Sequence, residues 1–316
     1  MFADRLIESI KAKNSCVVAG LDPRIEYIPS QILKKAFNYC GTDLKCAAQA
    51  IYDFNKGLID SIYDVVPAVK LQSAYYEMYG ADGVKAFYKT ANYAKKKGLL
   101  VIADAKRNDI GTTAQAYSSA FIGKISIEGT TLRSVLDADA VTVNPYLGID
   151  GIKPFIEDCN KYRKGIFILV KTSNKSSGQI QDLVTKDGKT IYEIVANHVE
   201  EWGASLIGKN GYSSIGAVVG ATYPNQAKEL RSVMKHAYIL VPGYGAQGGT
   251  AEDAANSFNE DGLGAIINAS RSIMCAYKAD IWKDKYTENQ FAEAARAETI
   301  RMRDEINIAV KKQFKG

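Results

Sequence analysis

Two charged residues follow directly after an apolar segment in the first third of the chain. The segment 99–103 reads LLVIA and continues into Asp104 and Lys106. A short apolar run of this kind is typical of a strand buried on both faces. Residues i and i+2 of a strand share a face, so Asp104 and Lys106 point the same way. Because buried charges are costly unless they are paired, either the strand reaches the surface here or these charges carry the function.

Two more charged side chains occupy similar places after the preceding apolar segments. Lys70 lies near the end of PAVKL with Gln72 on its side, and Asp22 follows CVVAG. Neighbouring strands lie about 4.8 Å apart, so these groups can join Asp104 and Lys106 in an alternating cluster of cations and anions. A ring of salt bridges that closes this end of the sheet is the structural alternative. Four such residues at one end favour a site for chemistry.

A glycine-rich segment and an arginine late in the chain indicate a phosphate site. The stretch LVPGYGAQGGTAED contains Gly243, Gly245, Gly248 and Gly249. These glycines let backbone N–H groups approach a ligand closely, and the next helix presents its N-terminus. Arg271 begins a short helix after the following apolar run, where a guanidinium can bind an oxyanion through two hydrogen bonds. Simple turn glycines are the alternative, but the combination with Arg271 favours phosphate binding.

Short apolar runs alternate with helix-period segments along nearly the whole chain. Eight runs are predicted to be strands: 16–20, 67–71, 99–103, 140–143, 166–170, 215–219, 238–241 and 265–268. This alternation predicts an α/β fold, the (β/α)8 TIM barrel, with a doubly wound open sheet as the alternative. We expect a single barrel domain over residues 1–316, with a C-terminal helical extension from about residue 280. The active site of such a barrel lies at the C-terminal face of its strands.

The overall composition is that of an ordinary globular protein. Of the 316 residues, 47 % are hydrophobic, and the formal net charge is +5 without a dense basic run, which argues against nucleic-acid binding. No apolar stretch approaches the ~20 residues of a membrane span, and charges stand where a signal peptide has its apolar core. The five cysteines form no C-x-x-C pair and predict reduced thiols. These features predict a cytoplasmic protein without membrane or nucleic-acid partners and without a metal site.

Taken together, the motifs resemble the orotidine 5′-monophosphate decarboxylase family, in its longer, type 2-like subfamily. The stretch 104–113, DAKRNDIGTT, is similar to the D-x-K-x-x-D-I-x-x-T signature of that family. Lys70, the glycine-rich loop 243–249 and NASRSI at 268–273 fit the family as well. VNPYLG and VKTSN resemble the longer subfamily. The resemblance covers residues 16–277.

The resemblance implies removal of CO2 from orotidine 5′-monophosphate to give uridine 5′-monophosphate, the last step of pyrimidine synthesis, without a cofactor. It implies that Lys106 protonates C6 of the pyrimidine and that Asp104 lies beside the substrate carboxylate. Lys70 would belong to the same charged array and contact the ribose side. Gln247 and Arg271 would hold the phosphate.

The resemblance further implies a homodimer with shared active sites. Asp109 would enter the site of the neighbouring subunit, with Ile110 and Thr113 beside it. Asp109 follows its strand by too many residues to turn back easily into its own site. Within one subunit, Asp22 would hold a ribose hydroxyl and Ser173 would face the pyrimidine ring.

Two other functions stay open at this point. Related barrel enzymes that act on phosphosugars use Mg²⁺ and carry an acidic ligand where this chain has Lys70, which favours the metal-free reaction. A barrel that binds a nucleotide phosphate without turnover is the alternative from another class. The set of Asp104, Lys106 and Asp109 argues against such a silent barrel.

Overall fold

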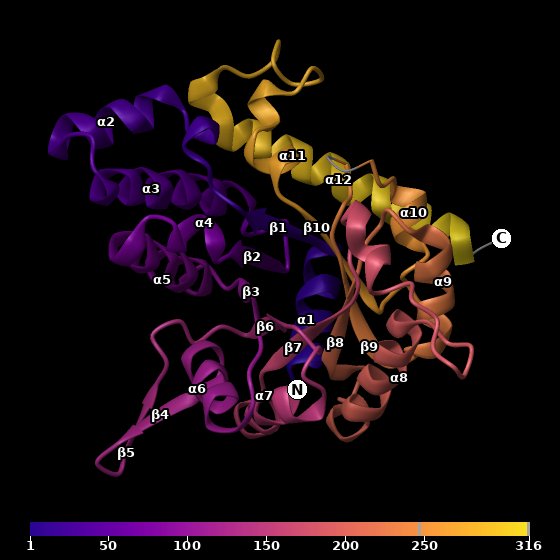
Figure 1. Ribbon diagram of the computed structural model, residues 1–316. Helices are drawn as coiled ribbons and strands as arrows, with labels where there is room; N and C mark the ends of the chain where they lie inside the picture. The colour runs from indigo at the N-terminus through magenta and orange to yellow at the C-terminus, as the bar shows by residue number, and fades with distance from the viewer. Residues whose placement is uncertain (246–247, 315–316) are drawn as a thin grey trace.

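Eight parallel strands form a closed barrel (Figure 1). The computed structural model describes residues 1–245 and 248–314. The barrel order is β1-β10-β9-β8-β7-β6-β3-β2, and β2 pairs with β1 to close the ring. The strands are β1 (Val17–Leu21), β2 (Ala68–Gln72), β3 (Leu100–Arg107), β6 (Ala140–Val143), β7 (Gly165–Lys171), β8 (Ser213–Val219), β9 (Ala237–Val241) and β10 (Ala265–Ala269). Each overlaps one predicted apolar run, so the predicted barrel is confirmed and the open sheet is wrong.

Helices surround the barrel, and this explains why its strands are apolar without alternation. In β1, Val17 and Ala19 pack toward the helices, while Val18 belongs to the cluster inside the barrel. Both faces of each strand are thus buried. The helices are α1 (Phe2–Lys13), α2 (Ser30–Cys40), α3 (Leu44–Ile62), α4 (Ala74–Glu77), α5 (Gly80–Lys96), α6 (Gly111–Phe121), α7 (Ile149–Tyr162), α8 (Ile191–Gly203), α9 (Pro224–Val233), α10 (Ala251–Ala255), α11 (Arg271–Met274) and α12 (Phe291–Phe314).

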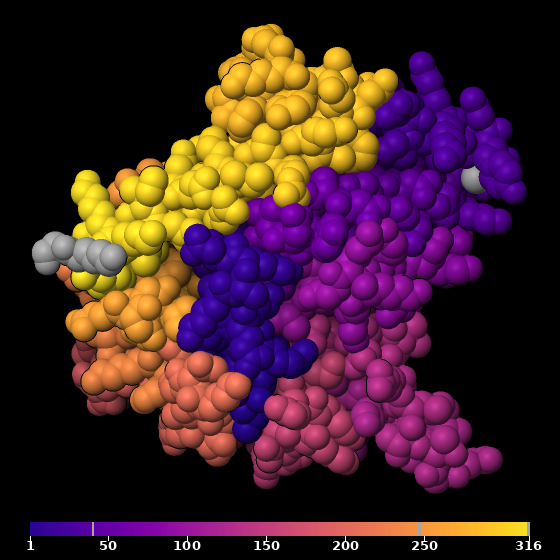
Figure 2. Space-filling model, turned by 180° about the vertical axis from the view of Figure 1, so that it is seen from behind, coloured from indigo at the N-terminus to yellow at the C-terminus, as the bar shows by residue number. Residues whose placement is uncertain are grey.

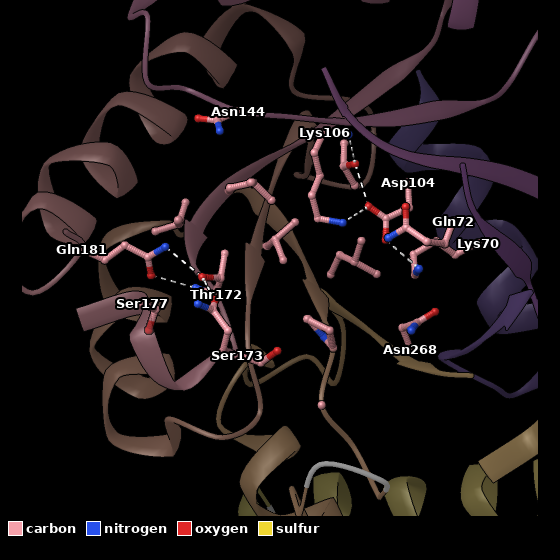
Figure 3. A pocket seen from close by; sticks show the side chains of 18 of the residues that line it. Lys70, Gln72, Asp104, Lys106, Asn144, Thr172, Ser173, Ser177, Gln181 and Asn268 are labelled. Carbon is pink, nitrogen blue, oxygen red and sulfur yellow. Dashed lines mark hydrogen bonds and ion pairs between the residues drawn. The ribbon is translucent and has the colours of Figure 1, made fainter. Parts of the chain in front are cut away.

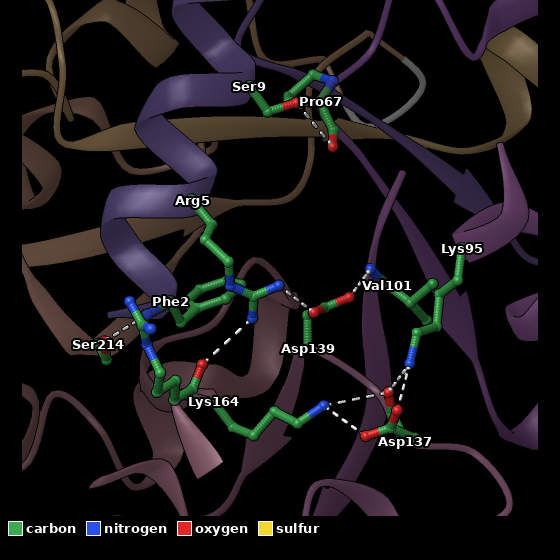
Figure 4. Close-up of polar contacts among 11 residues, drawn as sticks. Phe2, Arg5, Ser9, Pro67, Lys95, Val101, Asp137, Asp139, Lys164 and Ser214 are labelled. Carbon is green, nitrogen blue, oxygen red and sulfur yellow. Dashed lines mark hydrogen bonds and ion pairs between the residues drawn. The ribbon is translucent and has the colours of Figure 1, made fainter. Parts of the chain in front are cut away.

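Helix α1 covers the N-terminal end of the barrel. Its apolar residues, among them Phe2 and Leu6, are buried in the interior cluster. Phe2 meets Phe167 of β7 edge-on, with ring centroids 6.0 Å apart. Arg5 of α1 forms a 2.6 Å ion pair with Asp139 (Figure 4). The indigo helix crosses this face of the molecule in Figure 2, so the opposite, C-terminal end of the barrel is the one left for a ligand.

The last helix covers the side of the barrel where the first and last strands meet. Helix α12 packs against α3 and α10, which follow β1 and β9. A capping box between Thr287 and Gln290 begins the helical segment. Neither α12 nor any other described helix is both long and apolar enough to cross a membrane.

A hairpin that the sequence analysis does not predict projects from the barrel after α6 (Figures 1 and 2). Strands β4 (Lys124–Ile127) and β5 (Thr130–Arg133) pair antiparallel. The two residues between them, Glu128 and Gly129, have φ of 46° and 80°. Two consecutive positive φ values are typical of the tight hairpin turn whose twist matches that of its strands. In the sequence, the dipeptide Glu128-Gly129 between the β-branched Ile127 and Thr130 indicates such a turn.

The cysteines follow the prediction only in part. Cys16, Cys159 and Cys275 are free thiols. Cys46 is disulfide-bonded. The prediction of reduced thiols is therefore wrong for Cys46.

Candidate active site

A pocket of ≈1260 Å³ opens at the C-terminal end of the barrel. Strand ends and the loop after β7 form its walls (Figure 3). The predicted site residues that line it are Asp22, Lys70, Asp104, Lys106, Ser173, Gly243 and Arg271. A cavity of this kind, with a few convergent polar groups, is the usual form of a small-molecule site.

Asp104 is the centre of the charged cluster in this pocket. Its Oδ2 lies 2.7 Å from Nζ of Lys70, and its Oδ1 lies 2.5 Å from Nζ of Lys106. Oδ1 of Asp22 lies 3.7 Å from the same Lys70 nitrogen. The expected meeting of four alternating charges from three strand ends is therefore confirmed.

Two neutral side chains complete the surroundings of the Asp104 carboxylate. Gln72, which stands opposite Asp104 in the β2–β3 register, donates to Oδ2 at 3.2 Å. Thr142 of β6 donates to Oδ1 at 2.9 Å. Both carboxylate oxygens thus accept hydrogen bonds from fixed donors, which orients the group inside the pocket.

Burial and neighbouring charges oppose each other at the two central groups. The Lys70 and Asp104 side chains are only 5 % and 9 % exposed. Burial alone would lower the pKa of Lys70, but the carboxylates of Asp104 and Asp22 outweigh it and raise that pKa above its usual value. Burial would raise the pKa of Asp104, but Lys70 and Lys106 outweigh it and hold that pKa well below its usual range. Both central groups are therefore ionised at neutral pH.

Lys106 reaches the pocket through an unusual backbone conformation. Its φ is 50°, in the left-handed region that residues with a side chain rarely adopt. The β3–β6 register shifts between Ala103 and Arg107, and irregularities of this kind re-aim a side chain at a strand end. The backbone N–H of Lys106 donates to Thr142 Oγ1 at 3.0 Å, which holds the turn in place. With its side chain 44 % exposed, Lys106 is the most accessible of the four charged residues.

Two buried oxygen atoms in the pocket wall lack a hydrogen-bond donor among the described residues. They are Oδ1 of Asp22 and Oδ1 of Asn268. A buried acceptor without a donor costs free energy, and a bound hydroxyl group would supply what is missing. The pocket wall between the ends of β1 and β10 therefore offers two acceptor oxygens to a ligand that carries a donor group.

The glycine-rich loop after β9 contributes less to the pocket than its sequence suggests. Gly243 lines the pocket together with Arg271, the first residue of α11. The N–H groups of Gly245, Gly248 and Gly249 instead donate within the loop itself, at 2.9, 2.9 and 3.1 Å. Positive φ values at Gly243, Gly245 and Gly248 make this tight turn possible. Gln247 lies outside the described residues.

Ser173 lies in the pocket wall that the loop after β7 provides (Figure 3). Its neighbour Thr172 is held by Gln181, whose Oε1 accepts from the Thr172 N–H at 3.0 Å. Gly220 lies directly behind Ser173, because a Cβ at position 220 would come within 2.8 Å of Ser173 Cβ. The hydrogen bond of Thr172 on one side and the close approach of Gly220 on the other therefore hold Ser173 in place.

The residues expected to serve a second subunit are not part of this pocket. Asp109 uses its carboxylate Oδ1 to accept the N–H of Ile110 at 2.8 Å. The Ile110 side chain is exposed, and Thr113 lies on the exposed first turn of α6. None of the three is among the pocket-lining residues.

The sequence pattern does not single out two polar side chains of the pocket. Thr142 stands within the apolar run AVTV, and Asn268 stands within the motif NASRSI. A polar side chain that interrupts a short apolar strand, with apolar residues on either side, was the available signal. In the structure, Thr142 donates a hydrogen bond to Asp104, and Asn268 lines the pocket.

Comparison with known proteins agrees with the geometry. The model of the orotidine 5′-phosphate decarboxylase / HUMPS family matches residues 40–280. The orotidine 5′-phosphate decarboxylase of Caldicellulosiruptor saccharolyticus is 42% identical over 309 residues, which are 98% of this chain and 99% of that protein. The enzyme of the same name from Clostridium perfringens is 42% identical over 312 residues, 99% of this chain and 100% of that protein.

A solved structure extends the likeness to three dimensions. The OMP decarboxylase of Leishmania donovani is 30% identical, with a TM-score of 0.73 and coverage of 98% of each chain. The family match, the near-complete coverage and the charged cluster at the barrel mouth all agree. The chain belongs to the orotidine 5′-phosphate decarboxylase / HUMPS family.

Proposed function

We propose that this chain decarboxylates orotidine 5′-monophosphate to uridine 5′-monophosphate and CO2, the last step of pyrimidine synthesis, without cofactor or metal. The alternation of Lys70, Asp104 and Lys106 at the barrel mouth is the observation that carries this proposal. Family members that act on phosphosugars would need an acidic metal ligand at the place of Lys70. A buried ammonium there favours the nucleotide substrate.

The reaction breaks one carbon–carbon bond and forms one carbon–hydrogen bond. The substrate carboxylate leaves as CO2, and its bonding electron pair stays on C6 of the pyrimidine, in a ring without a good electron sink. The Lys106 ammonium stabilises that negative charge as it develops. Its N–H bond then breaks, and the proton bonds to C6. The neutral Lys106 amine takes up a proton from solvent before the next turnover.

Asp104 and Lys70 keep Lys106 ready for this step. The ion pairs of Asp104 with both lysines hold the three groups charged and oriented. In the proposed complex Asp104 faces the substrate carboxylate, and the two negative charges repel each other. Loss of CO2 relieves this repulsion, so the interaction is more favourable in the transition state than in the bound substrate.

The remaining pocket residues bind the ribose and the phosphate. Oδ1 of Asp22, which has no hydrogen-bond donor among the described residues, accepts a ribose hydroxyl, and Ser173 faces the pyrimidine. Arg271, Gln247 and the glycine-rich turn bind the phosphate. The phosphate lies far from C6, so its binding energy serves to close the site and to favour the transition state.

We propose further that the active form is a cytoplasmic homodimer with shared sites. Asp109 is partly exposed and lies outside the pocket of its own subunit, and beside it stands exposed Ile110. In a two-fold dimer each copy would supply Asp109 to the other's Lys70 and Lys106, with Ile110 and Thr113 at the contact.

The test is the ultraviolet absorbance of orotidine 5′-monophosphate mixed with purified protein, with and without excess chelator. Loss of the orotate chromophore at the same rate in both samples supports the proposal. Turnover that chelator abolishes would point to metal-dependent chemistry. Binding of the nucleotide without turnover would identify the chain as a silent, nucleotide-binding barrel.

A further inference from the structure

A buried lysine at the end of β7 has no part in the chemistry proposed above. The side chain of Lys171 is 0 % exposed. The β7–β8 register shifts between Leu169 and Lys171, so that Val170 is an extra residue in the ladder. Leu169 and Val170 both line the pocket. The bulge turns Lys171 toward the layer between barrel and helices, although strict alternation from Leu169 would point it into the barrel.

Four side chains surround the Lys171 ammonium. Nζ lies 2.5 Å from Oδ1 of Asp182 and 3.3 Å from Oγ of Ser177. The same nitrogen stands 4.5 Å from the ring centroid of Tyr223 and 5.5 Å from that of Tyr192, within the range of cation–π attraction. Asp182 and Ser177 both belong to residues 172–190, which we call the β7 loop. One amine therefore connects this loop to the barrel strand and to the helix layer.

The other side of the β7 loop forms a wall of the active-site pocket. Thr172, Ser173, Ser177 and Gln181 line that pocket (Figure 3). Gln181 donates to Thr172 Oγ1 at 2.8 Å and accepts from its N–H at 3.0 Å. Ser177 is the residue that both touches Lys171 and lines the pocket. A shift of the loop away from Lys171 would thus move the pocket wall as well.

The charge of Lys171 favours one position of the β7 loop, in which Asp182 forms an ion pair with the lysine. A buried ammonium without a carboxylate is strongly unfavourable, and the Asp182 side chain, which is 47 % exposed, comes from the loop itself. The ion pair exists only when the loop lies against β7. A displaced loop would break this ion pair and leave the lysine beside two aromatic rings without a carboxylate partner.

We propose that Lys171 is a positioning residue that fixes the β7 loop, and through it Ser173, against the base end of the substrate. This proposal rests on the proposed function, because it assigns the base end to the Ser173 side of the pocket. Lys171 touches neither the reacting atoms nor the phosphate site around Arg271. It acts on the loop through its ion pair with Asp182 and its hydrogen bond to Ser177.

The first test compares the kinetics of Lys171→Met and Asp182→Asn with the unmodified enzyme. Each variant should lose about a hundredfold in kcat/KM for orotidine 5′-monophosphate, the effect of a small misplacement of a substrate-contacting wall. The double variant should lose no more than the worse single variant, because both changes break one interaction. Lys171→Arg, which can keep the ion pair, should recover part of the activity.

Ribose 5-phosphate separates this role from general damage to the fold. It carries the sugar and phosphate but no base, so its inhibition constant should be unchanged in Lys171→Met and Asp182→Asn. Asp187→Asn is the matched control, since Asp187 is an exposed carboxylate of the same loop. That control should behave like the unmodified enzyme in both assays.

Trypsin gives a readout that does not need activity. Lys175, Lys186 and Lys189 are exposed cleavage sites within the β7 loop. Cleavage after Lys175 and Lys189 should be faster in Lys171→Met and Asp182→Asn than in the unmodified protein and in Asp187→Asn. Unchanged kcat/KM and unchanged cleavage in both variants would overturn the proposal, and so would an equal loss of ribose 5-phosphate affinity. If the unmodified protein itself fails to turn over the nucleotide, the proposed function fails, while the cleavage rates still decide whether Lys171 holds the loop.

Discussion

Asp104 shows why this pocket contains two lysines and two acids in alternation. It offers one oxygen to each lysine, at 2.7 and 2.5 Å, so neither ammonium is left in the pocket without a counter-charge. Lys70 is buried between Asp104 and Asp22 and is held rigidly. Among the described residues, Lys106 forms an ion pair with Asp104 alone, and it is much more exposed. The two lysines therefore fit the different roles proposed for them: Lys70 orients the carboxylate, and Lys106 is the one accessible to a substrate.

Replacing Lys106 tests the proposed proton donor. Lys106→Ala removes both the cation beside C6 and the proton source, so kcat should fall on the order of 10⁴-fold or more. Steady-state absorbance assays measure the change. Lys283→Ala is the control, because it removes an exposed lysine far along the chain. Residual activity within about tenfold of the unmodified enzyme would exclude Lys106 as the general acid.

Replacing Arg271 tests the proposed phosphate subsite. Arg271→Ala should raise KM for orotidine 5′-monophosphate by about 10- to 100-fold, because a charge-assisted contact to the phosphate is lost. Part of kcat should fall too, since phosphate binding energy contributes to closure. Turnover of orotidine, which lacks the phosphate, should be unaffected. Unchanged kinetics on the phosphorylated substrate would mean that the phosphate binds elsewhere.

Among the secondary-structure elements, irregular strand ends place the functional lysines. The register shifts at the end of β3, where Lys106 has a positive φ, and again at the end of β7 before Lys171. A bulge costs regular ladder hydrogen bonds but re-aims the side chain that follows. One shift directs Lys106 into the pocket, and the other directs Lys171 to the loop that covers it.

A contact between two outer helices predicts a measurable pH dependence of stability. Asp60 of α3 accepts from Lys56 at 2.7 Å and from Tyr93 of α5 at 2.6 Å, and it pairs with Lys97 at 2.6 Å. Burial would raise the pKa of Asp60, but these donors outweigh it and lower that pKa to about 2. The unfolded value is about 3.9. The stabilisation is therefore complete above about pH 5 and is lost as the pH falls through about 2.

The variant Asp60→Asn makes this dependence visible. It should lower the free energy of unfolding by about 1–2 kcal/mol at pH 7, allowing for partial exposure. The difference from the unmodified protein should vanish near pH 2. Urea unfolding at several pH values measures both. Asp53→Asn on the same helix is the control, and a deficit for Asp60→Asn that persists unchanged at pH 2 would contradict the assignment.

For the whole molecule, the position of Asp109 outside its own pocket is the observation that supports the proposed homodimer. Mixing the inactive variants Asp109→Ala and Lys106→Ala should restore activity if sites are shared. Random exchange between equal amounts makes half of the dimers mixed, each with one intact site of two, so about a quarter of full activity should return. Absorbance assays after subunit exchange measure it. No recovery, with mixed dimers proven by mass spectrometry, would rule out shared sites.

The sequence by itself determined the barrel and most of the charged cluster. Eight apolar runs without alternation identify strands buried on both faces, and Asp22, Lys70 and Asp104 stand at the ends of three of them. In a parallel barrel all strand ends of one kind meet at one face, so position along the chain was enough to bring these residues together. The resemblance to known decarboxylases rested on the same residues.

Only the tertiary structure decided the features that depend on where backbone and side chains turn. Lys106 was expected to follow from strand alternation, but a register shift and a left-handed backbone place it. The internal hydrogen bonds of the glycine-rich loop and the burial of Lys171 were equally absent from the sequence pattern. The physical reason is the same in each case. Bulges, loop hydrogen bonds and buried ion pairs depend on the folded positions of several segments, and a local pattern of apolar and polar residues carries no record of them.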